Sequence, residues 1–293
     1  MRIKNIFALV FIFLLFQSCA PDKDNAPEER ANKLRQQFSW ESGSPPMISA
    51  HRGGPTAHFP ENSLAAFQKS ADLGAKIIEC DIRTTSDGFL ILMHDKNLER
   101  TSTGKGKVEN HTLTELSGLY LKDFDGRITQ HKIPLLGDVL AWAIEQDIYL
   151  TLDIKTVEPS HLLTAIKKHK AEGQVIIIVY NFEDMMRYHN MAPHLMLSVS
   201  AGSINSLKNL FNYPIPKNRL MVFTGVRTVN SAVYQYLHEN KIYCILGTMH
   251  NIDNKAKKEG ISVYQELYKN GIDIISTDNV KLTAIAIREM KKY

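Results

Sequence analysis

Three carboxylate residues end two runs of the sequence that favour β-strands. Glu79 and Asp81 close one run, and Asp153 closes another. Successive side chains of a strand point to opposite faces, so Glu79 and Asp81 share a face, and the apolar Ile78 lies on the other. Carboxylates brought together repel one another unless a cation lies between them, and hard divalent cations prefer oxygen ligands. The pattern therefore predicts a metal site formed by these three residues.

A predicted hairpin adds a histidine to this group. Residues 76–94 contain two β-rich segments separated by the turn sequence TSDG. A turn centred near Asp87 and Gly88 would place Asp81 opposite His94. The imidazole would then lie at the level of the carboxylates.

Basic side chains complete a set that suits phosphoryl chemistry. His51 and Arg52 follow the first β-rich run, and Lys155 shares a strand face with Asp153. A cation and two basic side chains would neutralise a phosphodiester, while one imidazole accepts a proton and the other donates one. Paired carboxylates also serve glycosidases, but a mechanism based on carboxylates alone gives His94 no role.

The elements that must position these side chains alternate between strands and helices. Eight β-rich runs separated by amphipathic stretches predict a (β/α)8 TIM barrel, in which the C-terminal ends of the strands gather at one site. An open, doubly wound sheet is the alternative, but no GxGxxG sequence follows the first strand. The eight runs are 47–50, 76–81, 148–153, 175–179, 195–199, 219–223, 242–246 and 272–276.

The interval after the hairpin interrupts this alternation. Residues 95–133 contain a loop rich in Gly and Lys and then a short helix, for which Thr112 and Glu115 would form a capping box. We therefore expect about residues 95–133 to form a small insertion carried by the barrel. Insertions on that face of a barrel typically shape access to the substrate site.

The first 19 residues have the organisation of a signal peptide. A basic segment precedes eleven apolar residues, too few to span a bilayer comfortably, and the sequence that ends at Cys19 resembles a bacterial lipobox. Residues 20–45 are polar and suit a flexible tether. The prediction is an exported bacterial lipoprotein, anchored to a membrane through Cys19 on its periplasmic or cell-surface side, with the catalytic domain at 46–293.

The composition is that of a globular protein and narrows the classes of function. Of the 293 residues, 44% are apolar and 23% are charged. The net charge of +4 is not gathered into a basic stripe, so nucleic acid is not an expected partner, and no protein partner is implied. We expect Cys80 and Cys244 to be buried free thiols.

Five short motifs follow one another in the first part of the predicted barrel. They are HRGG at 51–54, PENS at 60–63, ECD at 79–81, TSDG at 85–88 and HD at 94–95. In this order and at these spacings they resemble the glycerophosphodiester phosphodiesterases. The resemblance continues in IPLL at 133–136 and TDN at 277–279. It implies a TIM barrel with a small inserted subdomain, and hydrolysis of small glycerophosphodiesters to glycerol 3-phosphate and an alcohol.

The resemblance also implies roles for single residues. It makes His51 and His94 the general acid/base pair and gives Arg52 and Lys155 contacts to the phosphate. Two residues of the PENS motif, Glu61 and Asn62, would orient neighbouring groups and cap the first helix, with Asn62 the better cap.

The same resemblance implies one divalent cation, Ca²⁺ or Mg²⁺, bound by Glu79, Asp81 and Asp153. The family usually has Glu where this chain has Asp153, whose side chain is one methylene shorter.

Two other functions stay open for the same scaffold. Bacterial phosphatidylinositol-specific phospholipases C share a related barrel and a histidine pair, so a cyclising phosphodiesterase is the near alternative. A catalytically inactive, lipid-anchored binding protein is the other, and the filled polar positions of all five motifs argue against it.

Overall fold

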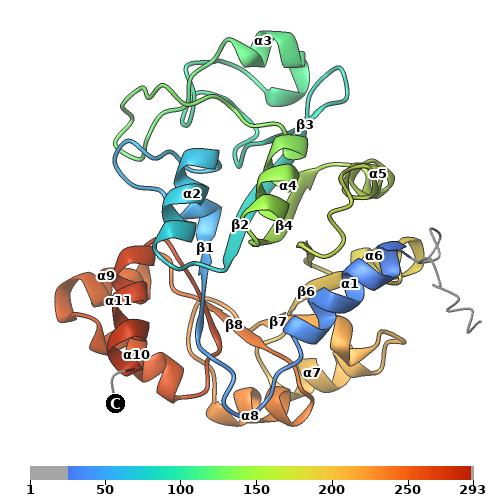
Figure 1. The fold of residues 1–293 in the computed structure, drawn as a ribbon, viewed down its shortest axis with the longest axis vertical. Helices are drawn as coiled ribbons and strands as arrows, with labels where there is room; N and C mark the ends of the chain where they lie inside the picture. Colours follow the sequence, from blue (N-terminus) through green and yellow to red (C-terminus); the bar gives the residue numbers. More distant parts are fainter. Residues whose placement is uncertain (1–25, 292–293) are drawn as a thin grey trace, which may run out of the picture.

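The chain alternates strands and helices around one sheet (Figure 1). The structure is a computed structural model that describes residues 26–291, so the predicted signal peptide and Cys19 lie outside the described residues. The strands are β1 (Met47–Ala50), β2 (Ile77–Thr84), β3 (Leu90–Leu92), β4 (Tyr149–Thr156), β5 (Val175–Val179), β6 (Met196–Ser200), β7 (Leu220–Phe223), β8 (Cys244–Gly247) and β9 (Ile274–Thr277).

Helices connect most of these strands. The α-helices are α1 (Ala26–Gln37), α2 (Leu64–Asp72), α3 (Leu113–Ser117), α4 (Leu136–Glu145), α5 (Pro159–His169), α6 (Phe182–Met191), α7 (Ile204–Phe211), α8 (Ser231–Glu239), α9 (Asn251–Glu259), α10 (Ser262–Lys269) and α11 (Val280–Met290). Short 3-10 helices are η1 (His51–Gly53), η2 (Val108–Asn110) and η3 (Lys217–Arg219). Within the described part of the chain, no helix is both long and apolar enough to cross a membrane.

Eight parallel strands close into a barrel. Their hydrogen bonds run in the order β1, β2, β4, β5, β6, β7, β8, β9, and β9 pairs again with β1. This closure confirms the (β/α)8 TIM-barrel fold. It also brings the C-terminal ends of all eight strands to one end of the barrel, the barrel mouth, where the predicted site residues lie.

Strand alternation divides the core into two apolar clusters. On β4, Leu150 and Leu152 pack in the cluster between the strands and the surrounding helices. Tyr149 contacts the second cluster, which joins residues such as Ile77 and Ile274 from most of the strands and therefore fills the barrel interior. Both Cys80 and Cys244 are buried free thiols, as predicted.

Residues 26–45 are not the flexible tether that we predicted. They begin with α1, and the buried side chains of Leu34 and Phe38 pack into the interior cluster at the N-terminal end of the barrel. The ring of Phe38 lies edge-on to those of Tyr149 and Tyr243, with centroids 4.9 and 5.9 Å away. The segment is polar overall, but Leu34 and Phe38 are four positions apart, the spacing that brings two side chains to one face of a helix. The prediction of a flexible tether overlooked this pair.

Polar contacts fasten the same segment to the barrel. Arg30 Nε lies 2.7 Å from Glu172 Oε2, and Trp40 Nε1 donates to Asp273 Oδ1 at 2.8 Å. Both carboxylates precede a strand, so α1 and the chain that follows it close the barrel at the end opposite the mouth.

The β2–β3 hairpin forms, but its register differs from the prediction by one residue. Ile82 pairs with Leu92, so Met93 faces Asp81 and its backbone N–H donates to the Asp81 carbonyl oxygen at 3.0 Å. The expected pairing of Asp81 with His94 is therefore wrong. His94 follows one position later, after β3 has ended.

The turn explains the shift. The Thr85 N–H donates to the Phe89 carbonyl oxygen at 2.9 Å, which closes a loop of three residues centred on Asp87. The Asp87 carboxylate accepts a hydrogen bond from the Thr85 hydroxyl at 2.6 Å and stabilises this longer turn. Loop length sets hairpin register, and a three-residue loop moves every pair by one position.

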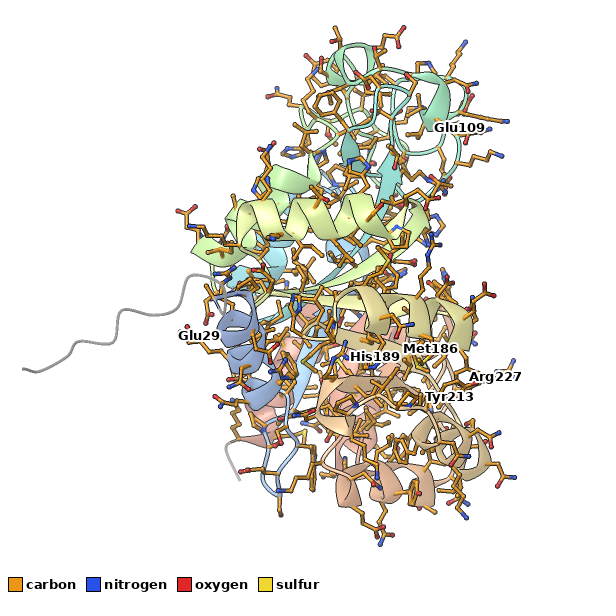
Figure 2. The ribbon with its side chains drawn as sticks, turned by 90° about the vertical axis from the view of Figure 1, so that its right-hand side faces the viewer. Glu29, Glu109, Met186, His189, Tyr213 and Arg227 are labelled. Atoms are coloured by element: carbon orange, nitrogen blue, oxygen red, sulfur yellow. The ribbon has the colours of Figure 1, made fainter. Side chains whose placement is uncertain are left out.

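Residues 95–133 pack around a small apolar cluster that they share with Ile91 of β3 and Met93. Thr112 and Glu115 form the predicted capping box at the start of α3. Figure 2 shows this part of the chain, which carries Glu109, as a lobe at one end of the molecule, away from Glu29 on α1. The buried residues of the cluster are Ile91, Met93, Leu98, Val108, Leu116, Leu121 and Ile133.

Candidate active site

Three buried carboxylates meet at the mouth of the barrel. Asp81 on β2 pairs in register with Asp153 on β4, and Glu79 precedes Asp81 on the same strand face. One oxygen of each carboxylate lies within 4.8 Å of an oxygen of the other two. The exposed fractions of Glu79, Asp81 and Asp153 are 7, 1 and 7%, so little solvent reaches this charge.

Several donors hold Asp81 in place. Asn62 donates from Nδ2 to Asp81 Oδ2 at 2.7 Å and accepts from the Asp81 backbone N–H at 2.9 Å. Lys155 Nζ lies 3.1 Å from Asp81 Oδ1, and Arg52 Nε lies 3.6 Å from Oδ2. Asp81 is thus the most fully partnered carboxylate of the three.

The two contacts to Asp81 exclude Asn62 from the capping role that we predicted. The N-cap of α2 is Ser63, whose hydroxyl oxygen accepts from the Ala66 N–H at 3.1 Å. Asn62 itself adopts a left-handed conformation, with φ of 55°, and turns its amide toward Asp81. Asparagine tolerates this conformation better than most residues, which suits it to this position.

The turn after β1 aims a backbone N–H at the carboxylates. Arg52 has φ of 49°, and its N–H donates to Glu79 Oε2 at 2.7 Å. The next residue, Gly53, has φ of 84°, and a Cβ there would lie 2.3 Å from the Phe67 ring. Only glycine fits, so the turn depends on the HRGG sequence.

The charges of the cluster are only partly compensated. Burial, and then the charge of Asp81, raise the pKa of Glu79 to about 8. Asp153 Oδ1 is buried and has no hydrogen-bond partner among the described residues. Buried oxygens that converge without enough donors are what a hard divalent cation requires, so the three residues fit such an ion.

His51 is fixed by a carboxylate that the sequence analysis did not assign. Its Nδ1 lies 2.8 Å from Asp278 Oδ1, just after β9. Burial lowers the pKa of His51, but the hydrogen bond to Asp278 and the charge of Glu79 outweigh burial and raise it above its usual value. Because Nδ1 is occupied, Nε2 is the atom left to exchange a proton with a substrate.

His94 has a similar partner within the insertion. Its Nδ1 lies 2.8 Å from Asp95 Oδ1, and its carbonyl oxygen accepts from Arg83 Nη2 at 2.7 Å. Hydrogen bonds from Arg100 hold the pKa of Asp95 well below its usual range, even though partial burial opposes this shift. The Asp95 carboxylate therefore stays ionised beside the imidazole.

Glu61 connects the two histidine segments. Its carboxylate accepts from Arg100 at 2.8 Å and from Arg52 Nη1 at 3.2 Å. Burial raises the pKa of Glu61, but the hydrogen bond from Arg100 outweighs burial and lowers it. Arg52, Glu61, Arg100 and Asp95 thus form a chain of ion pairs from His51 to His94.

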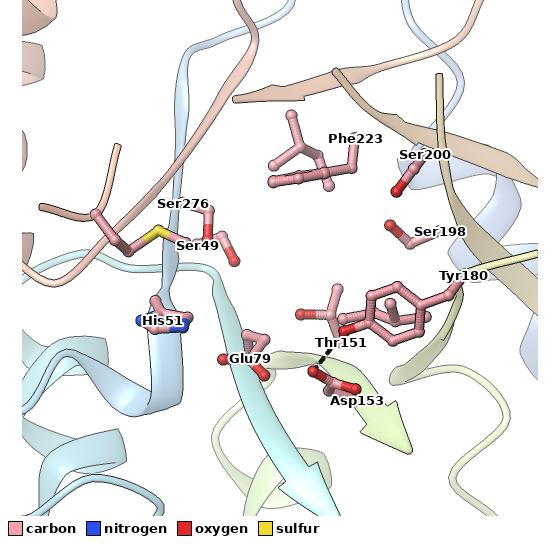
Figure 3. A pocket seen from close by; sticks show the side chains of 13 residues that line it. Ser49, His51, Glu79, Thr151, Asp153, Tyr180, Ser198, Ser200, Phe223 and Ser276 are labelled. Atoms are coloured by element: carbon pink, nitrogen blue, oxygen red, sulfur yellow. Dashed lines mark hydrogen bonds between the residues drawn. The ribbon is translucent and has the colours of Figure 1, made fainter. Parts of the chain in front are cut away.

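A cavity of about 160 Å³ lies at the barrel mouth beside the carboxylates. His51, Glu79 and Asp153 form its charged side (Figure 3). His94 is not among its lining residues. The wall contributed by β5 to β9 carries hydroxyl and apolar side chains: Ile178, Tyr180, Ser198, Ser200, Phe223, Ile245, Met249 and Ser276.

Two residues of the site escaped the sequence analysis. The Tyr180 hydroxyl donates to Asp153 Oδ2 at 2.7 Å, and burial followed by this hydrogen bond raises the pKa of Tyr180 far above its usual value. Asp278 binds His51 as described above. Tyr180 directly follows the predicted run 175–179, and Asp278 is the second residue after the predicted run 272–276, so the rule that strand ends converge could have identified both.

A closed parallel barrel with buried carboxylates, basic side chains and histidine–aspartate pairs at its mouth is the site of a TIM-barrel enzyme of the phosphodiesterase class. The model of the Glycerophosphoryl diester phosphodiesterase family matches residues 51–282. The chain belongs to this family.

Relatives extend this assignment. A glycerophosphodiester phosphodiesterase of Caldanaerobacter subterraneus is 34% identical over 161 residues, which cover 52% of this chain and 65% of that protein. A crystal structure of a glycerophosphoryl diester phosphodiesterase from Parabacteroides distasonis has a TM-score of 0.85 at 29% identity, covering 89% of this chain and 92% of that one. An Oleispira antarctica phosphodiesterase, solved with sn-glycerol-3-phosphate, has a TM-score of 0.69 at 20% identity over 83% and 97% of the two chains, which shows the common fold.

Replacing Asp278 by Asn should lower the pKa of His51, because the hydrogen bond and charge of Asp278 raise it. Since the folded-state pKa is raised, the stability that the pair contributes is present below about pH 6.5 and is lost as the pH rises through the raised value. An NMR titration of His51 in the metal-free protein measures the shift. Asp125→Asn in an exposed loop is the control, and an unchanged His51 titration in Asp278→Asn would contradict the assignment.

Proposed function

We propose that the protein hydrolyses glycerophosphodiesters to glycerol 3-phosphate and an alcohol, with Ca²⁺ or Mg²⁺ bound by Glu79, Asp81 and Asp153. The observation that carries the proposal is the converging carboxylate cluster, with its unpartnered Asp153 oxygen, beside a histidine fixed by an aspartate. Membership in the family supports the substrate class.

The bound cation would supply positive charge to the phosphoryl oxygens of the substrate. Arg52 and Lys155 both form ion pairs with Asp81, and from there they would bind the phosphate of the substrate. The uncharged wall of the cavity offers serine hydroxyls, which suit the hydroxyl groups of a glycerol moiety. Together these groups would hold the diester with its reacting phosphorus between the two histidine segments.

His51 and His94 would divide the proton transfers. Each has its Nδ1 beside an aspartate, so the aspartate orients the ring and stabilises its charged form. One Nε2 would accept a proton from the attacking water, and the other would donate a proton to the departing alcohol oxygen. Proton number is conserved, because one imidazole gains the proton that the other loses.

We also propose that Cys19 is acylated and anchors the protein to a membrane, after removal of a signal peptide at 1–19. The lipobox-like sequence supports this. The described part of the chain begins with α1, which packs at the barrel end opposite the mouth, so an anchor that precedes α1 favours a mouth that faces water and diesters dissolved in it.

Turnover should require a divalent cation. We expect the purified domain to release glycerol 3-phosphate from a glycerophosphodiester series with Ca²⁺ or Mg²⁺ and to lose this activity in EDTA. Asp81→Asn should lower turnover by about 10²-fold or more, because it removes a charged ligand and so weakens binding of the ion. Asp125→Asn should leave turnover unchanged. ³¹P NMR of the products measures this. Cation-independent turnover would refute the metal proposal, and a cyclic phosphate product would favour the cyclising alternative.

His51→Ala and His94→Ala should each lower turnover by about 10²–10⁴-fold, the usual contribution of a general acid or base. With a p-nitrophenyl phosphodiester, whose leaving group needs no proton, one variant should recover much of its activity and the other should not. Steady-state kinetics on both substrates measure the difference, with His161→Ala on α5 as the control. Equal losses on both substrates would refute the division of roles.

Cys19→Ser should release the protein from membranes, because the acylated thiol is lost. Palmitate labelling and membrane fractionation of the expressed full chain measure the effect. The anchor would be refuted if Cys19→Ser stayed in the membrane fraction as the wild type does, or if the wild-type protein carried no palmitate label.

A further inference from the structure

The two oxygens of Asp153 have different surroundings. Oδ2 accepts hydrogen bonds from the Tyr180 hydroxyl and from Lys155 Nζ, both at 2.7 Å. Oδ1 is buried and lacks a partner within the described residues. A carboxylate is planar, so donors that fix Oδ2 also fix the direction of Oδ1. The Asp153 carboxylate is thereby held in one orientation within the cluster that it forms with Glu79 and Asp81.

Tyr180 is well placed to hold Asp153 from the neighbouring strand. It directly follows β5, which pairs with the β4 strand that carries Asp153. Its side chain lies at the rim of the cavity, and its hydroxyl meets the carboxylate across the gap between the two strand ends (Figure 3). The contact therefore joins β4 to the first residue after β5 and does not link two residues of one loop.

Lys155 differs from Tyr180 as a donor to Asp153. Its ammonium group is shared, because it lies 2.7 Å from Asp153 Oδ2 and 3.1 Å from Asp81 Oδ1. Its positive charge also offsets the negative charge that would attract a cation. The neutral Tyr180 hydroxyl orients the carboxylate and leaves that charge in place.

We propose that Tyr180 is a positioning residue for the cation site: its hydroxyl fixes Asp153 Oδ2 and so holds the Asp153 carboxylate in the orientation in which it would bind the ion beside Glu79 and Asp81. The inference rests on the proposed function only through the cation site. It assigns Tyr180 no proton transfer and no contact with the reacting phosphorus.

Tyr180→Phe tests the role, because it removes the hydroxyl and keeps the ring that lines the cavity. We expect the dissociation constant of Ca²⁺ or Mg²⁺, measured by calorimetry on the metal-free protein, to rise about 10–100-fold, the usual effect of losing a partner of a metal ligand. Tyr236→Phe on α8 is the matched control and should bind as the wild type does. At saturating cation, Tyr180→Phe should regain a kcat within about twofold of the wild type, because the hydroxyl acts only through the ion.

Each other outcome has a definite meaning. If the wild type binds the cation and Tyr180→Phe binds it equally well, the positioning role is wrong and the proposed function stands. If Tyr180→Phe binds the cation normally but has a lowered kcat at saturation, the hydroxyl acts on the substrate and the inference is overturned. If the wild type binds neither cation, the cation site and the inference both fail. Thermal unfolding of each variant verifies that the fold is retained.

Discussion

The charge of three buried carboxylates at one end of the barrel is the constraint on which the rest of the site depends. Removing an ionised carboxylate from water costs several kcal/mol even after relaxation, and Glu79, Asp81 and Asp153 are each less than 10% exposed. The surrounding structure reduces this cost unevenly. Asn62, Lys155 and Arg52 all contact the Asp81 carboxylate. In contrast, Glu79 keeps a raised pKa, and one Asp153 oxygen has no hydrogen-bond partner in the described part of the chain.

This uneven compensation has a physical consequence for binding. A cluster neutralised completely by protein donors would have no attraction left for a cation, and one with no donors would destabilise the folded barrel. Asp81 is held in place by protein donors, whereas the negative charge of Glu79 and Asp153 is less fully compensated and is available to attract a cation. The parallel register of β2 and β4 makes this arrangement possible, because it sets Asp81 directly beside Asp153.

Two residues near the carboxylate cluster have an unusual backbone conformation that directs donors toward it. Arg52 and Asn62 both have positive φ, which is uncommon for residues other than glycine and costs free energy. Each bend delivers a donor: the Arg52 N–H reaches Glu79, and the Asn62 amide reaches Asp81. Because the Asn62 amide is used in this way, the capping of α2 falls to Ser63. The conformation of these loops therefore serves the buried carboxylates, and Asn62 and Gly53 are residue types that permit it.

The sequence allowed the barrel and the carboxylate face to be predicted, because strand alternation and strand order are local patterns. Features that depend on three-dimensional contacts were missed or misplaced. The predicted hairpin register was wrong by one residue because the turn has three residues and not two, and the hydrogen bond from Thr85 to Asp87 stabilises this longer turn. Phe38 was assigned to a tether because its binding place, between Tyr149 and Tyr243, is built from distant strands.

The two histidine–aspartate pairs differ in what supports them, although their local geometry is alike. Asp278 follows β9, which pairs with β1 and so places the aspartate beside His51 within the barrel itself. Asp95 belongs to the insertion, whose apolar cluster is separate from the barrel core. Apolar packing therefore cannot alone set the position of His94 relative to the carboxylates.

Hydrogen bonds tie the His94 segment to β2, from the Met93 N–H to the Asp81 carbonyl oxygen and from Arg83 to the His94 carbonyl oxygen, and ion pairs add a second connection. Arg100 joins Asp95 to Glu61, and Glu61 joins Arg52. The Arg100 side chain is 49% exposed, and an exposed ion pair taken singly contributes little. A connected chain of charges, however, fixes several side chains at once, because moving one of them breaks the contacts of its neighbours. The ion pairs of Arg52 with Glu61, of Glu61 with Arg100 and of Arg100 with Asp95 thus link the buried carboxylates to the aspartate that orients His94.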